Sequence, residues 1–183
     1  DKPLPAELVE QIVDKTDGVP LFLEELTKAV RESELLEDLG YRYGVSGRLD
    51  KLTIPNTLRD SLMARLDRLI PVKEIAQIGA VIGREFSYDL VRAVTPMSQA
   101  KLDEALERLT ASGLVFRRGT GEQASYLFKH ALVQDAAYDS LLLGKRQGLH
   151  AQIAEAIEAR LPEKVRSEPE LLAHHYTEAG LLQ

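Results

Sequence analysis

The feature that most constrains the fold is the stretch 98–129, where a helical pattern runs directly into a hairpin pattern. In "QAKLDEALERLTA" the apolar residues recur at i, i+3, i+4 and i+7, the spacing of one helix face: Leu102, Ala105, Leu106 and Leu109. Ser98 is a candidate N-cap for this helix, and Gly113 is expected to end it. In "LVFRRGTGEQASYLF", β-branched and aromatic runs flank a polar turn that contains glycine, which predicts a hairpin.

Two more helical patterns precede this stretch. "PVKEIAQIGAVIG" carries its apolar residues on one face, and we expect Gly79 to let another helix approach closely. Ser87 is a candidate cap for a short helix that contains Leu90 and Val94. Three helices followed by a hairpin predict a winged-helix-like unit in residues 71–129.

The segment before residue 71 is also predicted to be mostly helical. We expect helices over residues 5–16, from Pro20 to about Ser33, and over 55–69, with Gly18 at a helix C-terminal cap. In the last of these helices a leucine stripe is predicted to face inward, with the charged residues mostly off it: Leu58, Leu62, Leu66 and Leu69, against Asp60, Arg65, Asp67 and Arg68. Residues 41–54 suit two short strands or an ordered loop better than a helix.

Helical patterns continue to the end of the chain. They cover "HALVQDAAYDSLL" and "KRQGLHAQIAEAIEARL", and "EPELLAHHYTEAGLLQ" begins another helix. In the second of these, the residues expected to face inward are Leu149, Ile153, Ala156 and Ile157. The sequence therefore predicts a mainly α fold with one small β-hairpin unit.

The charge balance bears on possible partners. A formal net charge of -6 opposes sequence-independent binding to a phosphate backbone, so nucleic-acid binding would need a local basic patch. The chain has no cysteine, which is compatible with a reducing cytoplasm and excludes thiolate chemistry. The first residues lack a signal-peptide pattern, and no apolar run is long enough to span a bilayer. We expect a cytoplasmic location and no membrane contact.

Residues that could carry chemistry do not form a catalytic set in the sequence. No Gly-x-x-x-x-Gly-Lys-[Ser/Thr] loop occurs, so the chain alone is not expected to hydrolyse ATP. Glu24 and Glu25 are adjacent, point to different sides of a helix, and are predicted to be solvated acids near a helix start. We expect no catalytic residue and no metal site, and we predict that this chain is not an enzyme by itself.

The four histidines are predicted to be structural. His174 and His175 are adjacent, whereas a helical metal pair needs i, i+4 spacing, so one is expected to be packed and the other exposed. His130 is expected to bond a nearby carbonyl or carboxylate rather than act in catalysis. His150 lies on an amphipathic helix, and a structural role is expected there as well.

A winged-helix pattern raises the question of DNA binding. The candidate reading helix, 99–111, carries two basic and three acidic side chains, which opposes contact with phosphates. Arg117 and Arg118 in the predicted wing could touch a DNA backbone, although arginines at a hairpin are also ordinary solvated edge residues. DNA is therefore disfavoured as a partner.

The stretch "GVPLFLEEL" resembles the Gly-x-Pro element of STAND-type ATPases, signal-transducing relatives of AAA proteins, where it opens the helical lid after the nucleotide-binding core. Five further stretches look, in order, like the downstream part of large bacterial proteins of this kind: "IPNTLRDSLMARLDRL", "IGAVIGREFSYDLV", "LERLTASGLVFRR", "YLFKHALVQDAAYDSLL" and "LHAQIAEAIEAR". Such proteins carry a class III adenylate or guanylate cyclase domain, the ATPase core, a winged helix and tetratricopeptide-like repeats. The closing "ELLAHHYTEAG" resembles the first helix of such a repeat, and its expected packing positions are Ala173, Tyr176, Ala179 and Gly180.

The resemblance implies a division of the chain and a site. Residues 1–70 would be the helical lid, 71–129 the winged helix, and 130–183 a helical bridge and the first repeat helix. Pro20 would lie against the base of a bound adenine nucleotide and Gly18 would permit the tight turn, while the phosphate-binding loop and magnesium ligands would lie before residue 1. ATP or ADP with Mg would thus bind only the full-length protein. A helix cap followed by a Pro-initiated helix also explains "GVPLF" without a nucleotide.

The function implied is regulatory. The chain would couple the nucleotide state of the upstream core to an output domain, such as a cyclase, and to a protein or small-molecule effector at the downstream repeats. The alternative is the DNA-binding winged helix of an ATP-dependent transcription regulator. A third hypothesis, an independent hydrolase, is disfavoured because no catalytic set is present.

Overall fold

The computed structural model describes residues 3–31, 36–41, 43–45, 57–69 and 72–181. Ten α-helices and five short strands lie within these ranges, so the expected mainly α class is confirmed. The chain divides into two compact units, Asp1–Arg65 (unit 1) and Leu66–Gln183 (unit 2). This division falls near the predicted boundary after residue 70, and the further boundary after residue 129 stays a prediction.

Unit 1 is built on two helices joined by a tight turn. Helices α1 (Ala6–Thr16) and α2 (Pro20–Arg31) form where the apolar spacing predicts them, and they close one core: Leu8, Ile12, Phe22, Leu26 and Val30. Strands β1 (Leu36–Asp38) and β2 (Tyr43–Val45) pair antiparallel beside them. Strand β2 lies within the predicted stretch 41–54, but β1 begins earlier than expected, and residues 46–56 lie outside the described residues.

Helix α3 (Leu58–Asp67) follows the predicted leucine stripe. Leu62 and Leu66 are fully buried, and Leu58 packs against the core of unit 1. Thr57 caps the helix, because its Oγ1 accepts a hydrogen bond from the backbone N of Asp60 at 3.0 Å. The predicted start at Pro55 lies outside the described residues.

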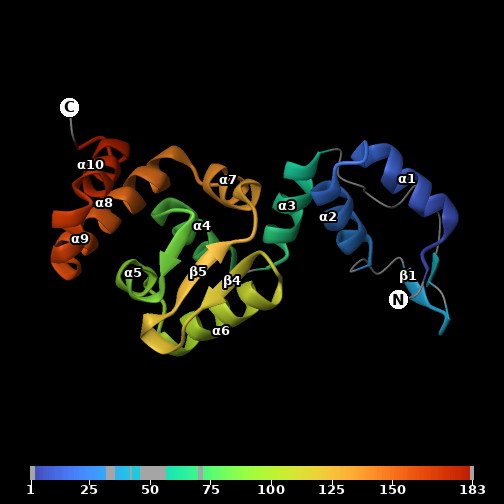
Figure 1. Ribbon diagram of the computed structural model, residues 1–183, viewed down its shortest axis with the longest axis horizontal. Coiled ribbons are helices and arrows are strands. Elements are labelled where there is room, and N and C mark those ends of the chain that lie inside the picture. Colours follow the sequence, from blue (N-terminus) through green and yellow to red (C-terminus); the bar gives the residue numbers. More distant parts are fainter. Residues whose placement is uncertain (1–2, 32–35, 42, 46–56, 70–71, 182–183) are drawn as a thin grey trace. The chain divides into compact units, whose positions relative to one another are not determined.

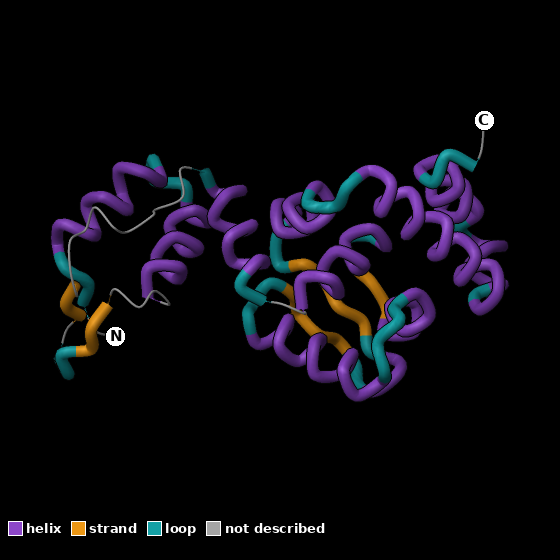
Figure 2. The backbone as a smooth tube through the Cα atoms, turned by 180° about the vertical axis from the view of Figure 1, so that it is seen from behind, coloured by secondary structure: helices purple, strands orange, loops and turns teal. Residues whose placement is uncertain are grey.

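Unit 2 contains the predicted helices and hairpin in the predicted order, and their assignment as a winged helix stays a prediction. Its elements, in chain order, are α4 (Val72–Ile82), β3 (Glu85–Ser87), α5 (Tyr88–Val94), α6 (Gln99–Ala111), β4 (Val115–Arg118) and β5 (Ser125–Phe128). The three strands form an antiparallel sheet in the order β3-β5-β4, with Phe86 opposite Tyr126 and Phe116 opposite Leu127. Figures 1 and 2 show the strands side by side with the helices around them. Strand β3 was not predicted. It lies at one edge of the sheet and pairs with β5 of the hairpin.

The closest contact at Gly79 is with an aromatic ring. A Cβ at this position would lie 2.6 Å from Cε1 of Phe86, a β3 residue that is itself fully buried. The absent side chain thus makes room for the Phe86 ring, which was not expected from the sequence, and a close helix approach at Gly79 stays a prediction. Ser87 caps α5 as predicted, whereas Ser98 occupies the N-cap position of α6 without a side-chain hydrogen bond.

Four helices complete unit 2: α7 (Ala131–Asp139), α8 (Leu143–Arg160), α9 (Pro162–Ser167) and α10 (Pro169–Glu178). Helix α8 packs on α4, α5 and α10, and its Ile153 and Ile157 are buried as predicted. In α10 the buried residue is His175. Ala173 and Gly180 are both exposed, so their expected packing positions were wrong. None of the helices in the described ranges combines the length and the apolar character that crossing a bilayer requires.

Candidate functional site

The turn between α1 and α2 places Gly18 and Pro20 at one exposed point of unit 1. Asp17 and Gly18 adopt left-handed conformations, with φ of 47° and 69°, and the backbone N of Val19 donates to the carbonyl of Thr16 at 2.9 Å. A Cβ at Gly18 would meet nothing within 4 Å. Glycine is therefore favoured here by its positive φ and not by lack of space. Pro20 begins α2, where a missing backbone N–H costs nothing.

A pocket of about 620 Å³ opens beside Pro20. It is lined by one side of α2 and by a residue of β2: Pro20, Leu23, Glu24, Thr27, Lys28, Arg31 and Tyr43. Pro20 and Leu23 supply apolar surface at one end, and Lys28 and Arg31 supply positive charge in the last helical turn. Such a surface can accept a flat apolar ring that carries an anionic group.

The sequence contained a signal for this pocket that the prediction did not use. Residues 20, 23, 24, 27, 28 and 31 occupy positions i, i+3, i+4, i+7, i+8 and i+11, so they share one helix face. The prediction placed Pro20 in a nucleotide site but did not extend it to Lys28 and Arg31. No metal-binding group of three or more acidic, histidine or cysteine side chains occurs among the residues that the structure describes.

The two acids that follow Pro20 differ in their surroundings. Glu24 is exposed and lines the pocket, as expected for a solvated acid. Glu25 is buried and forms an ion pair with Arg65 of α3, which is buried as well. The prediction that Glu25 is solvated, and that Arg65 lies off the buried stripe, was therefore wrong. The buried opposite charges of these two residues, which are 40 positions apart in sequence, neutralise each other between α2 and α3.

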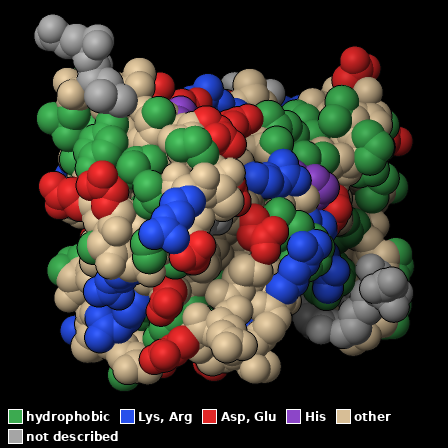
Figure 3. Space-filling model, turned by 60° about the vertical axis from the view of Figure 1, so that its left-hand side comes forward, with side chains coloured by type: hydrophobic (Ala, Val, Ile, Leu, Met, Phe, Trp, Pro, Cys, Tyr) green, Lys and Arg blue, Asp and Glu red, His purple; other side chains and the backbone are tan. Residues whose placement is uncertain are grey.

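The wing arginines lie beside acids. The guanidinium of Arg118 lies 3.6 Å from a carboxylate oxygen of Glu85, and Arg117 lines a small pocket with Asp103, Glu107 and Glu122. Both arginines therefore have acidic neighbours of their own. Basic and acidic side chains are also interspersed across the face drawn in Figure 3.

The exposed side of α6 is acidic. Lys101 and Arg108 share it with three acids: Asp103, Glu104 and Glu107. Asp103 accepts a hydrogen bond from the Tyr88 hydroxyl at 2.8 Å. Burial, together with the hydrogen bond and the negative charge of Asp103, raises the pKa of Tyr88 to about 12. The hydroxyl thus stays protonated and fixes Asp103 on the surface that would face DNA in a reading helix.

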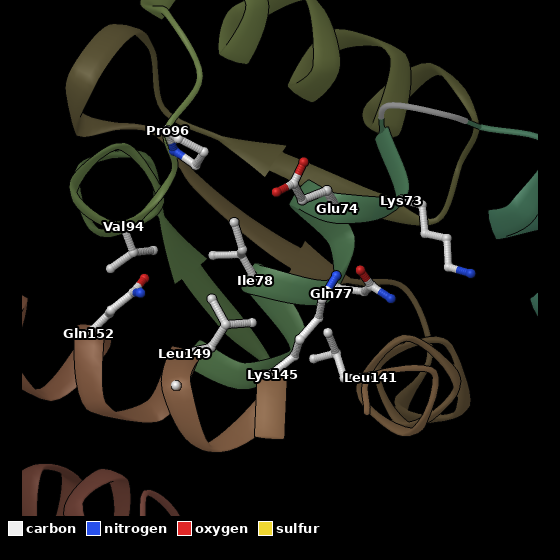
Figure 4. Close-up of a pocket in the computed structure, with 11 residues that line it drawn as sticks. Lys73, Glu74, Gln77, Ile78, Val94, Pro96, Leu141, Lys145, Leu149 and Gln152 are labelled. Carbon is white, nitrogen blue, oxygen red and sulfur yellow. The ribbon is translucent and has the colours of Figure 1, made fainter. Parts of the chain in front are cut away.

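A second pocket, of about 630 Å³, lies between α4, the end of α5 and α8 (Figure 4). The side chains of Ile78, Val94 and Leu149 form its apolar part, and Lys145, Gln77 and other polar residues surround it. Gly148 of α8 also lines it, and a Cβ there would meet nothing within 4 Å. This pocket has an apolar interior and polar edges.

The predictions for the histidines are confirmed only in part. His175 is buried and His174 exposed, which confirms that only one of the adjacent pair is packed. His130 precedes α7, and its Nε2 is buried without a hydrogen-bond partner among the described residues, so that nitrogen does not make the expected bond. The prediction missed that His150 contacts both His174 and His175, because these residues are distant in sequence.

The comparisons with known proteins found a similar protein, but they assign no activity to it. No family model matches the chain. The chain is similar to an uncharacterized protein of Rhizobium meliloti (strain 1021), with 28% identity over 181 residues that cover 96% of the chain. The chain spans about 17% of the length of that relative. It is thus similar to one segment of a much longer protein.

Proposed function

We propose that this chain is a non-catalytic coupling segment of a longer cytoplasmic signalling ATPase. In this proposal unit 1 is a lid on an upstream nucleotide-binding core, the winged helix is an interaction module, and the last helices lead into tetratricopeptide-like repeats. ATP or ADP with Mg would bind the full-length protein, and an effector at the repeats would bias its state. The output would be a class III nucleotide cyclase domain.

The apolar surface that unit 1 leaves uncovered carries the proposal. Leu8 and Ile12 turn into the core, whereas Val9 and Val13 on the same helix expose 42% and 48% of their surface. Val19 and Leu23, which flank Pro20, are also exposed large hydrophobic residues. Two helices with apolar residues on both their inner and outer sides are typical of an element that packs on a second surface.

The pocket beside Pro20 supports the choice of an adenine nucleotide. Its apolar end at Pro20 and Leu23 suits a base, and Lys28 and Arg31 suit the negative charge of phosphates. An upstream core would supply the phosphate-binding loop that the chain itself lacks. The lid would then favour one nucleotide state by contacts made in that state alone, which is the requirement for coupling.

The test is the substitution Pro20→Ala in the full-length protein. Loss of the proline ring removes apolar contact with the base, and we expect ATP affinity to fall roughly tenfold, about 1.4 kcal/mol. Pro169→Ala is the matched control, because Pro169 is also exposed and also begins a helix. Unchanged ATP affinity in the Pro20 variant would refute the lid assignment.

The alternative, a DNA-reading winged helix, has the topology of unit 2 in its favour. The acidic exposed side of α6 and the acidic neighbours of Arg117 and Arg118 weigh against it. A mobility-shift titration with duplex DNA at low salt separates the two functions, since backbone binding is strongest there. Tight, salt-sensitive binding that is lost on changing both arginines to alanine would favour the alternative.

A further inference from the structure

Helices α8 and α10 meet through two buried histidines, at the end of unit 2 that holds α9 (Figure 1). His150 of α8 and His175 of α10 expose 1% and 0% of their surface. Their Nδ1 atoms lie 2.9 Å apart, and the Nε2 of His150 lies 3.0 Å from the hydroxyl oxygen of Tyr138 in α7. The contact is thus a hydrogen-bonded chain of three side chains from three helices.

The number of protons on the two imidazole rings determines whether this chain of hydrogen bonds can form. One proton between the two Nδ1 atoms makes a hydrogen bond, which neutral imidazoles satisfy in either direction. If both rings are protonated, two N–H groups face each other and the bond is replaced by repulsion. A single added proton also costs free energy, because it places a positive charge between two buried rings, and the Nε2 of His175 has no hydrogen-bond partner among the described residues to stabilise it.

The charged groups around the pair come from α7, α8 and α10. Arg146 lies over the ring of Tyr138, 4.1 Å from its centroid, and is 3.8 Å from Asp139, while α10 contributes His174 and Glu178. Helices α4, α5 and α9 contribute apolar side chains to the core that α8 shares with them: Val81, Leu90 and Val165. The two histidines therefore lie between a mainly apolar core and a small set of mixed charges.

These surroundings disfavour the cationic forms of both rings. Burial, together with the charges of His150 and His174, lowers the pKa of His175 to about 4. Burial also lowers the pKa of His150, with His174 and Arg146 acting in the same direction and Glu178 opposing them. A histidine on a released helix would instead titrate near its ordinary pKa of about 6.5.

We propose that the His150–His175 contact is an acid-sensitive latch, which holds α10 on α8 while both imidazoles are neutral and releases it on acidification. The latch does not depend on the proposed function, because it requires neither a nucleotide nor DNA. The released helix would uncover the partly buried Leu171 and Leu172, which pack on the core around Ile153 and Ile157.

The direction of the pH effect follows from the lowered pKa values. At pH values well above about 6.5 both states are neutral, and docking is at its strongest. As the pH falls below 6.5, the released state takes up protons that the docked state resists, so docking weakens progressively toward pH 4. For one histidine with values of about 4 and about 6.5, release is favoured about thirtyfold more at pH 5 than at pH 7.5.

Hydrogen exchange of the 183-residue chain at pH 5.0 and pH 7.5, corrected for the intrinsic rates, tests this latch. Protection of α10 is expected to fall about thirtyfold at pH 5.0, while protection of α4 changes less than threefold. His175→Gln removes the titrating ring and should reduce the response of α10 at least fivefold. His174→Gln is the matched control, because His174 is adjacent but exposed, and it should keep most of the response.

Equal protection of α10 at both pH values would overturn the latch, and so would a response in His175→Gln as large as in the parent chain. If the variant does not fold, imidazole titrations of the parent chain by NMR replace it: two pKa values well below 6.5 support the latch, and values at or above 6.5 refute it. Loss of the response on adding EDTA would instead assign the pair to a metal ion, and would also overturn it.

Discussion

Replacing Gly79 with alanine is expected to destabilise unit 2, although alanine forms helices better than glycine. Gly79 lies inside α4, where its new Cβ would lie 2.6–2.8 Å from three carbon atoms of the Phe86 ring. The ring has little room to retreat, because Phe86 is buried and its centroid lies 5.5 Å from that of Tyr126 and 5.4 Å from that of Phe128. The substitution therefore forces a shift in the aromatic core.

The magnitude follows from a comparison of two glycines. Gly79→Ala gains about 1 kcal/mol of helix propensity and loses about 1–3 kcal/mol to overpacking. Gly148→Ala in α8 gains the same propensity, and its Cβ meets nothing within 4 Å. Because propensity cancels between the two variants, we expect their free energies of unfolding to differ by about 1–3 kcal/mol, with Gly148→Ala the more stable.

Urea unfolding followed by circular dichroism measures this difference. Hydrogen exchange in α6 should accompany it, since a chain of two units need not unfold in one step and α6 reports on unit 2. If Gly79→Ala proved as stable as Gly148→Ala, the close contact between Gly79 and the Phe86 ring would be refuted. If Gly148→Ala lost stability, the open space at the position of the added Cβ of residue 148 would be refuted.

Two further predictions concern single interactions. Glu25→Ala should lower the stability of unit 1 by about 3–5 kcal/mol, because it leaves the Arg65 guanidinium buried without its carboxylate. Hydrogen exchange in α2 measures this loss of stability, and a loss below about 1 kcal/mol would contradict a buried pair. Ser87→Ala should cost about 1 kcal/mol, because the Ser87 hydroxyl oxygen accepts a hydrogen bond from the backbone N of Leu90. Ser98→Ala should cost less, since its side chain makes no cap bond; thermal unfolding of both variants compares them, and equal losses would argue against the difference.

The helices could be predicted from the sequence because their cores depend on spacing within one element. Leu102, Leu106 and Leu109 recur at helical intervals, and all three are buried as that pattern predicts. The hairpin followed in the same way from the polar, Gly-bearing turn between Val115 and Phe128. Local patterns of this kind contain the information needed to place an element.

Contacts between distant elements could not be predicted in this way. Glu25 has the same local sequence signal as Glu24, yet it is buried because Arg65 approaches it from another helix. His150 and His175 are 25 positions apart, so neither residue alone indicates that their rings meet. The partner of Gly79 was likewise missed because strand β3 was not expected. In each case the deciding group lies on an element whose position the local pattern does not give.

The same distinction between local patterns and distant contacts applies to the candidate site. The turn that holds Gly18 and Pro20 was predictable, because glycine and proline have strong local preferences. The pocket beside it needed Tyr43 of β2 as well as one face of α2, and only the folded unit brings them together. Whether this pocket contacts a nucleotide stays a prediction of the proposed function.

The most direct test of the central claim is calorimetric titration with ATP and ADP. The 183-residue chain would be compared with a longer chain from the same gene that includes the proposed phosphate-binding core. The account predicts no binding by the 183-residue chain and binding by the longer one, weakened by Pro20→Ala but not by Pro169→Ala. Equal binding by both chains would contradict it, because the nucleotide site would then lie within these residues and need no upstream core.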